Sequence, residues 1–501
     1  MELEERKAKE NIFNEIKDIS FIKELNEQKL SLRRKKISQI FSIKRRNNLE
    51  KIKNSLNLLK KQSELQINKF SSSFDRIILN LKSSDTNIQS YTLKQLNIYF
   101  QYYEPDINEQ KMIMDGQFLE LLLNLGIKFS FNDEANIIPI LCIFINIQIY
   151  NEGNGEYLIS LYSDKFFEFY NKCFIQSKSD EIVNKIILLL YYMANINCGI
   201  NIKILQSRVF ESIINFSINE DQDLGFKELI IKLITICLNI SKNCELDEKE
   251  TKIIDKCLTI LKNESIKGNE KIKKICYQGL YNISKINDDY EFNKKMINEE
   301  IPRLILETKN KNILLYSLKT LTNILTVPDE YLDQLNLEEI ISYYDSIINL
   351  YKDEDKIIYI ILNGICNIAD SKYINVVKSS IIWDQIIIQI LFNKNEDIQL
   401  LFIEIIKYII NSGNLNNLKF IYNTKILEYL IYFISNSIKD NKILIKILEL
   451  IDNYLSRFRN CDKGNAHYLV IYNKFKDFLF CFHDLINEEN DVFEYIKKKY
   501  K

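Results

Sequence analysis

The stretch IIYIILNGICNI at residues 357–368 carries the pattern that decides the fold, and IIKLITICLNI at residues 230–240 repeats it. Both stretches are too long and too rich in Leu and Ile for ordinary strands. Each stretch closes on Asn-Ile, at Asn239 and at Asn367. The pattern predicts buried helices that end on an asparagine.

The same Asn-Ile ending recurs along the chain at spacings of 41 to 49 residues. The asparagines of this series, which we call the ladder asparagines, are Asn97, Asn146, Asn195, Asn239, Asn282, Asn323 and Asn367. One more period reaches Ile410, where the apolar pattern continues without an asparagine, and the next reaches Asn453. Other Asn-Ile pairs, such as the one at Asn312, fall off the series, so chance recurrence is the alternative. We favour the ladder because each of its asparagines closes an apolar run of helical length.

This period predicts the fold class. Repeats in the low forties are typical of armadillo and HEAT arrays, in which each helical hairpin or triplet buries its apolar stripe only against its neighbours. We therefore predict an all-α superhelical solenoid of about nine to ten repeats. One asparagine per repeat would line the concave face with amide donors and acceptors suited to the backbone of an extended peptide.

Composition argues against several other classes of protein. The 501 residues include four prolines and 11 scattered glycines, and no stretch reads as a linker between globular domains. Ten cysteines form no C-x-x-C pair, which favours reduced core thiols. The longest uncharged stretches reach 17 residues, whereas a membrane-spanning helix needs about 20. We therefore expect no membrane insertion.

Catalysis finds little support in the sequence. The chain has two histidines, and it has no glycine-rich phosphate loop and no clustered metal-ligand spacing. We therefore expect a protein that is not an enzyme and that uses no cofactor and no metal.

A basic segment precedes the repeats. Residues 29–53 hold ten Lys and Arg residues against the single acid Glu50, in a chain of formal net charge −1, so the rest of the chain is acidic. Within it, LRRKKISQIFSIKRRNN at residues 32–48 places an apolar middle between two basic clusters. This order predicts an amphipathic helix followed by a short basic peptide. A solvated helix face or a nonspecific nucleic-acid arm is the alternative, but we expect no direct nucleic-acid binding.

The basic segment and the repeats together resemble the importin alpha family. Residues 32–47 are similar to its importin-beta-binding segment, in which a basic stretch and a short apolar step precede K-R-R-N. Residues 77–100 resemble the family's first armadillo repeat, and residues 475–496 resemble its last. The resemblance implies an adaptor for nuclear protein import that shuttles between cytoplasm and nucleus. Residues 1–70 would bind importin beta, and residues 71–501 would form the armadillo solenoid.

The resemblance also implies site residues and partners. Importin beta would be bound by Arg33, Arg34, Lys35, Lys36, Lys44, Arg45 and Arg46. Proteins bearing nuclear localisation signals would be bound in a cargo groove by Asn146, Tyr191, Asn195, Asn239, Asn323 and Asn367. A nuclear export receptor is expected at the C-terminal repeats. In the family, the cluster matching residues 44–46 also occupies the groove until importin beta withdraws it.

The groove departs from the family at its aromatic positions. In importin alpha, tryptophans that stack on cargo lysines lie one helical turn before key ladder asparagines. The matching residues here are Cys142, Tyr191, Thr235, Gln278, Lys319 and Asn363, and the sole tryptophan, Trp383, lies off the ladder. We therefore expect a divergent member with a narrow or altered cargo set. A protein-interaction scaffold without a transport role is the alternative function.

Overall fold

The computed structural model describes most of the chain from residue 70 onward. The described residues are 70–102, 107–114, 117–150, 164–196, 198–217, 224–240, 246–286, 290–308, 310–383, 386–412, 414–437, 441–461 and 466–481. The proposed importin-beta-binding residues, Arg33, Arg34, Lys35, Lys36, Lys44, Arg45 and Arg46, lie outside them. The described chain is helical throughout its regular structure, and it divides into two compact units at residues 233 and 234.

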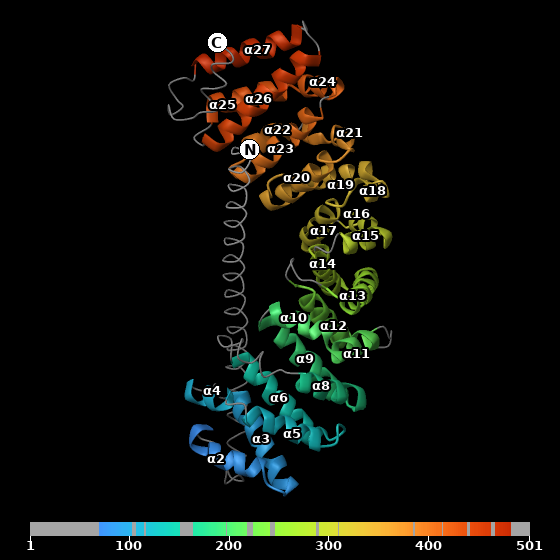
Figure 1. Cartoon of the computed structure of the whole chain (residues 1–501), viewed down its shortest axis with the longest axis vertical. Helices are drawn as coiled ribbons and strands as arrows, with labels where there is room; N and C mark the ends of the chain where they lie inside the picture. The colour runs from blue at the N-terminus through green and yellow to red at the C-terminus, as the bar shows by residue number, and fades with distance from the viewer. Residues whose placement is uncertain are drawn as a thin grey trace, which may run out of the picture. The chain divides into compact units, whose positions relative to one another are not determined.

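Unit 1 is a stack of short helices that ends inside α12 (Figure 1). Its helices are α2 (Phe70–Leu81), α3 (Thr86–Tyr102), α4 (Ile107–Met114), α5 (Gln117–Lys128), α6 (Glu134–Tyr150), α8 (Asp164–Gln176), α9 (Asp180–Ile196), α10 (Cys198–Gln206), α11 (Arg208–Ser217) and the first part of α12 (Leu224–Cys237). Three of these helices pack in series, since α3 contacts α6 and α6 contacts α9.

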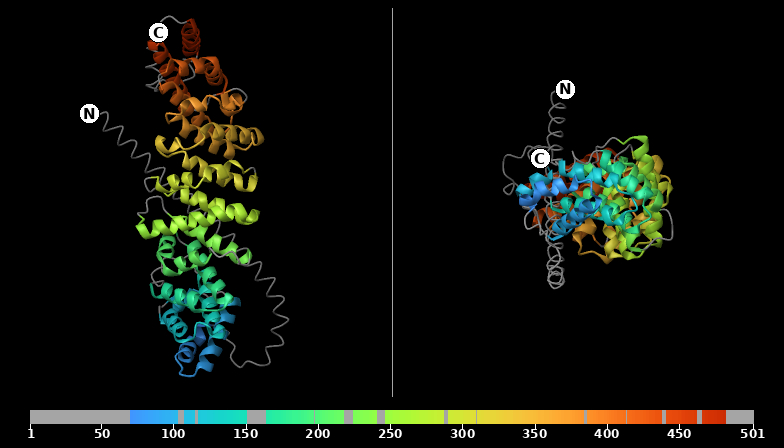
Figure 2. Two further views of the ribbon diagram at one scale, coloured as in Figure 1. Left: turned by 90° about the vertical axis from the view of Figure 1, so that its right-hand side faces the viewer. Right: turned by 90° about the horizontal axis from the view of Figure 1, so that it is seen from below.

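Unit 2 is itself built from successive layers of helices (Figure 2). Its helices after α12 are α13 (Glu248–Lys267), α14 (Glu270–Ser284), α15 (Glu291–Asn298), α16 (Ile301–Leu306), α17 (Lys311–Ile324), α18 (Asp329–Leu332), α19 (Leu337–Leu350), α20 (Asp355–Ala369), α21 (Ile374–Val377), the 3₁₀ turn η1 (Ile381–Trp383), α22 (Ile387–Leu391), α23 (Glu396–Asn411), α24 (Leu415–Asn423), α25 (Ile426–Ser437), α26 (Asn441–Cys461) and α27 (Ala466–Cys481).

Within each unit, the helices that carry the ladder positions pack one after another, and we call them the ladder helices. In unit 2 they are α14, α17, α20, α23 and α26, each in contact with the next. Their apolar residues recur at helical spacing, so that α20 buries Ile357, Ile358, Ile361, Ile365 and Ile368 against its neighbours. The predicted all-α repeat solenoid of armadillo type is thereby confirmed.

The repeats of unit 2 take two forms. α15 and α16 meet at Glu300, and α24 and α25 meet at Lys425, where φ angles of 55° and 57° turn the chain in the left-handed region. These breaks give three-helix repeats of armadillo type. By contrast, α13 runs without interruption for 20 residues before α14, which makes a two-helix repeat like those of HEAT arrays.

The position of the ladder in α23 differs from the expectation. The series points to Ile410, but Ile410 is fully buried. When the buried positions of α20 and α26 are matched to those of α23, Tyr408 occupies the place of Asn367 and Asn453. The spacing of the ladder shortens before α23 and lengthens after it, because the intervening segments α21–α22 and α24–α25 differ in length.

The uncharged stretches of the sequence lie in short helices. The stretch at residues 135–151 forms most of α6, and the stretch at residues 186–202 is divided between α9 and α10. In the part of the chain that the structure describes, no helix is both long and apolar enough to cross a membrane.

Candidate functional site

The ladder asparagines of α14, α17 and α20 tie these helices to the repeat before each of them. Their side-chain nitrogens donate hydrogen bonds across the repeat boundary: Asn282 Nδ2 to the Thr235 carbonyl (2.8 Å), Asn323 Nδ2 to Ser284 Oγ (2.9 Å) and Asn367 Nδ2 to the Thr322 carbonyl (3.0 Å). Asn282 is buried, whereas Asn323 and Asn367 are half-buried. A carboxamide has two N–H groups and one acceptor oxygen, so a single donated bond orients it and uses only part of its capacity.

The ladder residues of unit 1 lie on α6 and α9. Asn146 is half-buried on α6. On α9, Tyr191 and Asn195 come together, since Asn195 Nδ2 donates to the Tyr191 carbonyl one helical turn earlier (2.8 Å). The Tyr191 ring lies edge-on to Tyr192, with 5.8 Å between ring centroids. Tyr191, at one of the six tryptophan-equivalent positions, thus lies beside the ladder asparagine Asn195.

Lysines gather on the ladder face of α14 and α17. Lys285 Nζ lies 4.9 Å from the centroid of the Tyr281 ring, and Lys319 Nζ lies 5.3 Å from the same centroid. Tyr316 flanks this ring at 6.1 Å between centroids. Two turns before Tyr281, Lys274 is exposed on the same side of α14. We call Lys274, Tyr281, Lys285, Tyr316 and Lys319 the basic cluster.

The basic cluster also contacts a predicted site residue. Lys285 Nζ donates to Asn239 Oδ1 at 3.2 Å, so this asparagine, which follows α12, accepts from a lysine of the chain itself. Lys319, which occupies a tryptophan-equivalent position, stands one turn before Asn323 on α17. At this position a cation therefore stands in place of an aromatic ring that would receive one.

Acidic residues also lie on the ladder face, at the end of α20 and in the second half of α23. Tyr408 of α23 hydrogen bonds Asp370, the residue after α20, and burial together with Asp370 raises the pKa of Tyr408 to about 12. The phenol is therefore protonated at neutral pH. Glu404 lies one turn before Tyr408 and pairs with Lys407 at 2.8 Å. The ladder face of unit 2 thus carries the acids Asp370 and Glu404 at α20 and α23, where α14 and α17 carry lysines.

Trp383 is a core residue. Its ring is 2% exposed and packs against Phe402 and Phe420, with centroids 5.6 and 5.5 Å away. Its indole Nε1 donates to the Val377 carbonyl at 2.8 Å. Trp383, which lies off the ladder in the sequence, therefore serves in packing between helices.

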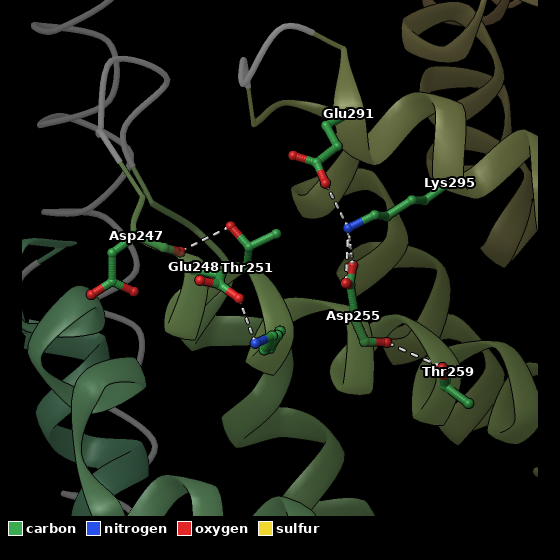
Figure 3. A network of polar contacts seen from close by, with 8 residues as sticks. Asp247, Glu248, Thr251, Asp255, Thr259, Glu291 and Lys295 are labelled. Carbon is green, nitrogen blue, oxygen red and sulfur yellow. Dashed lines mark hydrogen bonds and ion pairs between the residues drawn. The ribbon is translucent and has the colours of Figure 1, made fainter.

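The acidic run at residues 247–250 caps a helix. Asp247 Oδ1 accepts from the Glu250 backbone N–H and Glu250 Oε2 accepts from the Asp247 N–H, both at 2.8 Å, which forms a capping box at the start of α13. Farther along α13, Asp255 binds Lys295 of α15, which also pairs with Glu291 (Figure 3). These contacts join α13 to the next repeat.

No metal site is evident in the described part of the chain, where no three His, Cys, Asp or Glu side chains lie close enough to hold an ion. The six cysteines whose side chains the structure describes are free. Five of them are buried: Cys173, Cys237, Cys257, Cys276 and Cys366.

Several residues of the face were not found from the sequence. Tyr281, Lys285, Tyr316 and Tyr408 were missed because each lies one to three residues from the expected register or in a helix without the asparagine. The signal for Tyr281, Lys285 and Tyr316 was their helical spacing from Gln278 and Lys319, and for Tyr408 it was the buried stripe of α23.

Comparisons with known proteins bear on the fold alone. No protein-family model and no curated protein match the chain. Among solved structures, the crystal structure of an engineered protein matches with a TM-score of 0.60 at 14% identity, covering 85% of this chain and 97% of that one. Two designed armadillo repeat proteins, one in complex with the peptide (KR)4, match with TM-scores of 0.40 over 50% of this chain and 98% of theirs, at 15% and 14% identity. The first match supports a helical-repeat fold.

Proposed function

We propose that this protein acts by binding other proteins and not by catalysis, and that the ladder face of unit 2 holds an extended peptide. The observation that carries the proposal is the orientation of Asn323 and Asn367 by hydrogen bonds to the preceding repeat. Packed helices lie about 8–10 Å apart and an extended chain advances about 3.3 Å per residue, so each repeat would face about two or three peptide residues. A second N–H and the Oδ1 of each asparagine would bind the peptide backbone.

Peptides selected from a random library on the full-length chain test this proposal. We expect the combined substitution Asn323→Ala and Asn367→Ala to weaken a selected peptide at least about tenfold in fluorescence anisotropy, because each lost hydrogen bond contributes about 1 kcal/mol. Asn416→Ala changes an exposed asparagine of α24 outside the ladder helices and serves as the control. Equal affinity of the double variant and the unchanged protein would refute the ladder as the binding face.

The finer proposal is a nuclear import adaptor that moves between cytoplasm and nucleus. Its support is the order of basic clusters at residues 32–47 ahead of the armadillo-like repeats. Importin beta would bind that segment, the ladder face would hold nuclear-localisation-signal proteins, and an export receptor would bind the C-terminal repeats. A scaffold without a transport role is the second candidate, and it needs only the repeats and the ladder.

Binding of the full-length chain to purified importin beta across a salt series separates these two candidates. A matched variant has Arg33, Arg34, Lys44, Arg45 and Arg46 changed to alanine. An adaptor binds tightly and loses binding in the variant, with affinity that falls as salt screens the basic segment. Absence of importin-beta binding at physiological salt would favour the scaffold.

A further inference from the structure

Ladder helices α14 and α17 present a face of one charge. From Lys271 to the end of α14, and along all of α17, there is no Asp or Glu. The exposed or half-buried lysines on the ladder side are Lys271, Lys274, Lys285 and Lys319. A face of this kind attracts anionic ligands and disfavours a second set of lysines.

The lysines are also positioned. Two ammonium groups, from consecutive repeats, converge on the Tyr281 ring at 4.9 and 5.3 Å from its centroid. The ring attracts both charges, and the hydrogen bond from Lys285 to Asn239 limits the freedom of one of them. A carboxylate that binds an ammonium group already oriented in this way gains a charge-assisted hydrogen bond at a lower entropic cost of ordering the lysine.

We propose that the basic cluster binds an acidic, extended segment of a partner protein. This inference rests on the proposed peptide-binding ladder and names the chemistry of its ligand at this end of unit 2. Lys285 and Lys319 would bind carboxylates of the segment, and Asn323, one turn after Lys319, would bind its backbone. A lysine-rich segment would be repelled here, because the positive charge of Lys319 lies one turn from Asn323, the asparagine that would bind the backbone of the segment.

The test is a fluorescence-anisotropy titration with two labelled octapeptides, one alternating Ser and Glu and the other alternating Ser and Lys. All proteins are full length and have the seven basic residues of the N-terminal segment (33–36 and 44–46) changed to alanine, so that this segment does not capture the acidic probe. We expect the acidic peptide to bind at least about tenfold more tightly than the basic one and to weaken as salt rises.

Two pairs of substitutions locate the effect. Lys285→Gln with Lys319→Gln is expected to weaken the acidic peptide at least about tenfold. Lys252→Gln with Lys256→Gln removes the same charge from exposed positions of α13, outside the ladder helices, and is expected to leave the affinity unchanged. Lys274→Gln, at an exposed position, is expected to lower the affinity for the acidic peptide severalfold while leaving the contacts of the Tyr281 ring unchanged. Circular dichroism confirms that each variant is folded.

The outcomes separate this inference from the proposed function. If Asn323→Ala weakens a peptide that the lysine pair does not affect, the ladder binds peptides and the acidic preference is wrong. If substitution of Lys285 and Lys319 abolishes binding and Asn323→Ala has no effect, the basic cluster is the binding site. The proposal that the ladder asparagines bind the peptide backbone is then wrong. Equal losses in the Lys285/Lys319 and Lys252/Lys256 pairs would show attraction by net charge alone and overturn the inference.

Discussion

At the scale of the residue, Asn367 joins α20 to the preceding ladder helix. Its Nδ2 donates to the Thr322 carbonyl of the preceding ladder helix at 3.0 Å. We expect Asn367→Ala to lower the free energy of unfolding by about 1 kcal/mol, the usual net value of such a hydrogen bond, as measured by urea denaturation. Asn363→Ala, one turn earlier on the same helix and also half-buried, is the control and should cost less. Equal losses would mean that the cross-repeat bond does not stabilise the stack.

The buried thiols give a second prediction at this scale. Burial raises the pKa of Cys173 and of Cys366 to about 12. The thiolate is therefore disfavoured in the folded state, and the stability tied to these groups is lost as pH rises from the unfolded value of about 8.5. At about pH 8, iodoacetamide should label neither residue in the native chain and both in concentrated urea, as read by mass spectrometry. Rapid native labelling of Cys173 would contradict its burial.

At the scale of elements, Gly364 controls the approach of α19 to α20. A Cβ at this position would lie 2.8 Å from Tyr344 Cζ and 2.9 Å from its Cε2, closer than packed atoms come. In an open helix Gly→Ala stabilises by about 1 kcal/mol, but overpacking costs about 1–3 kcal/mol. We therefore expect Gly364→Ala to lower the melting temperature. In a Tyr344→Leu background, which removes the ring, the same change should be neutral or stabilising, and a stabilised Gly364→Ala single variant would prove this packing argument wrong.

At the scale of the whole molecule, the contacts of each ladder helix with its neighbours govern stability. In unit 2, α20 packs on α17 and α23, and stacked repeats are stabilised mainly through nearest neighbours. Ile361, which is fully buried in α20, should on change to alanine cost about 2–5 kcal/mol. Hydrogen exchange should then rise most in α17, α20 and α23 and least in α13 and α26. Lys356→Ala, exposed on the same helix, is the control, and a uniform rise across unit 2 would indicate a single cooperative block.

The sequence by itself determined the helical type, the repeat and the place of an asparagine near the end of successive ladder helices. It could do so because helix formation and the buried stripe depend on residues three and four apart, which are read directly from the chain. The same local reading placed Tyr191 beside Asn195, since they lie one turn apart on α9.

Only the tertiary structure decided what the ladder face presents. It placed Tyr408 in the register expected of Ile410, turned Asn323 and Asn367 toward the preceding repeat, and brought Lys285 and Lys319 to one ring. Each of these outcomes depends on contacts between residues of different repeats, whose distance in space is set by the lengths of the intervening helices and turns. Local periodicity carries no information about that distance, and for this reason the charge of the ladder face emerged only once the repeats were stacked.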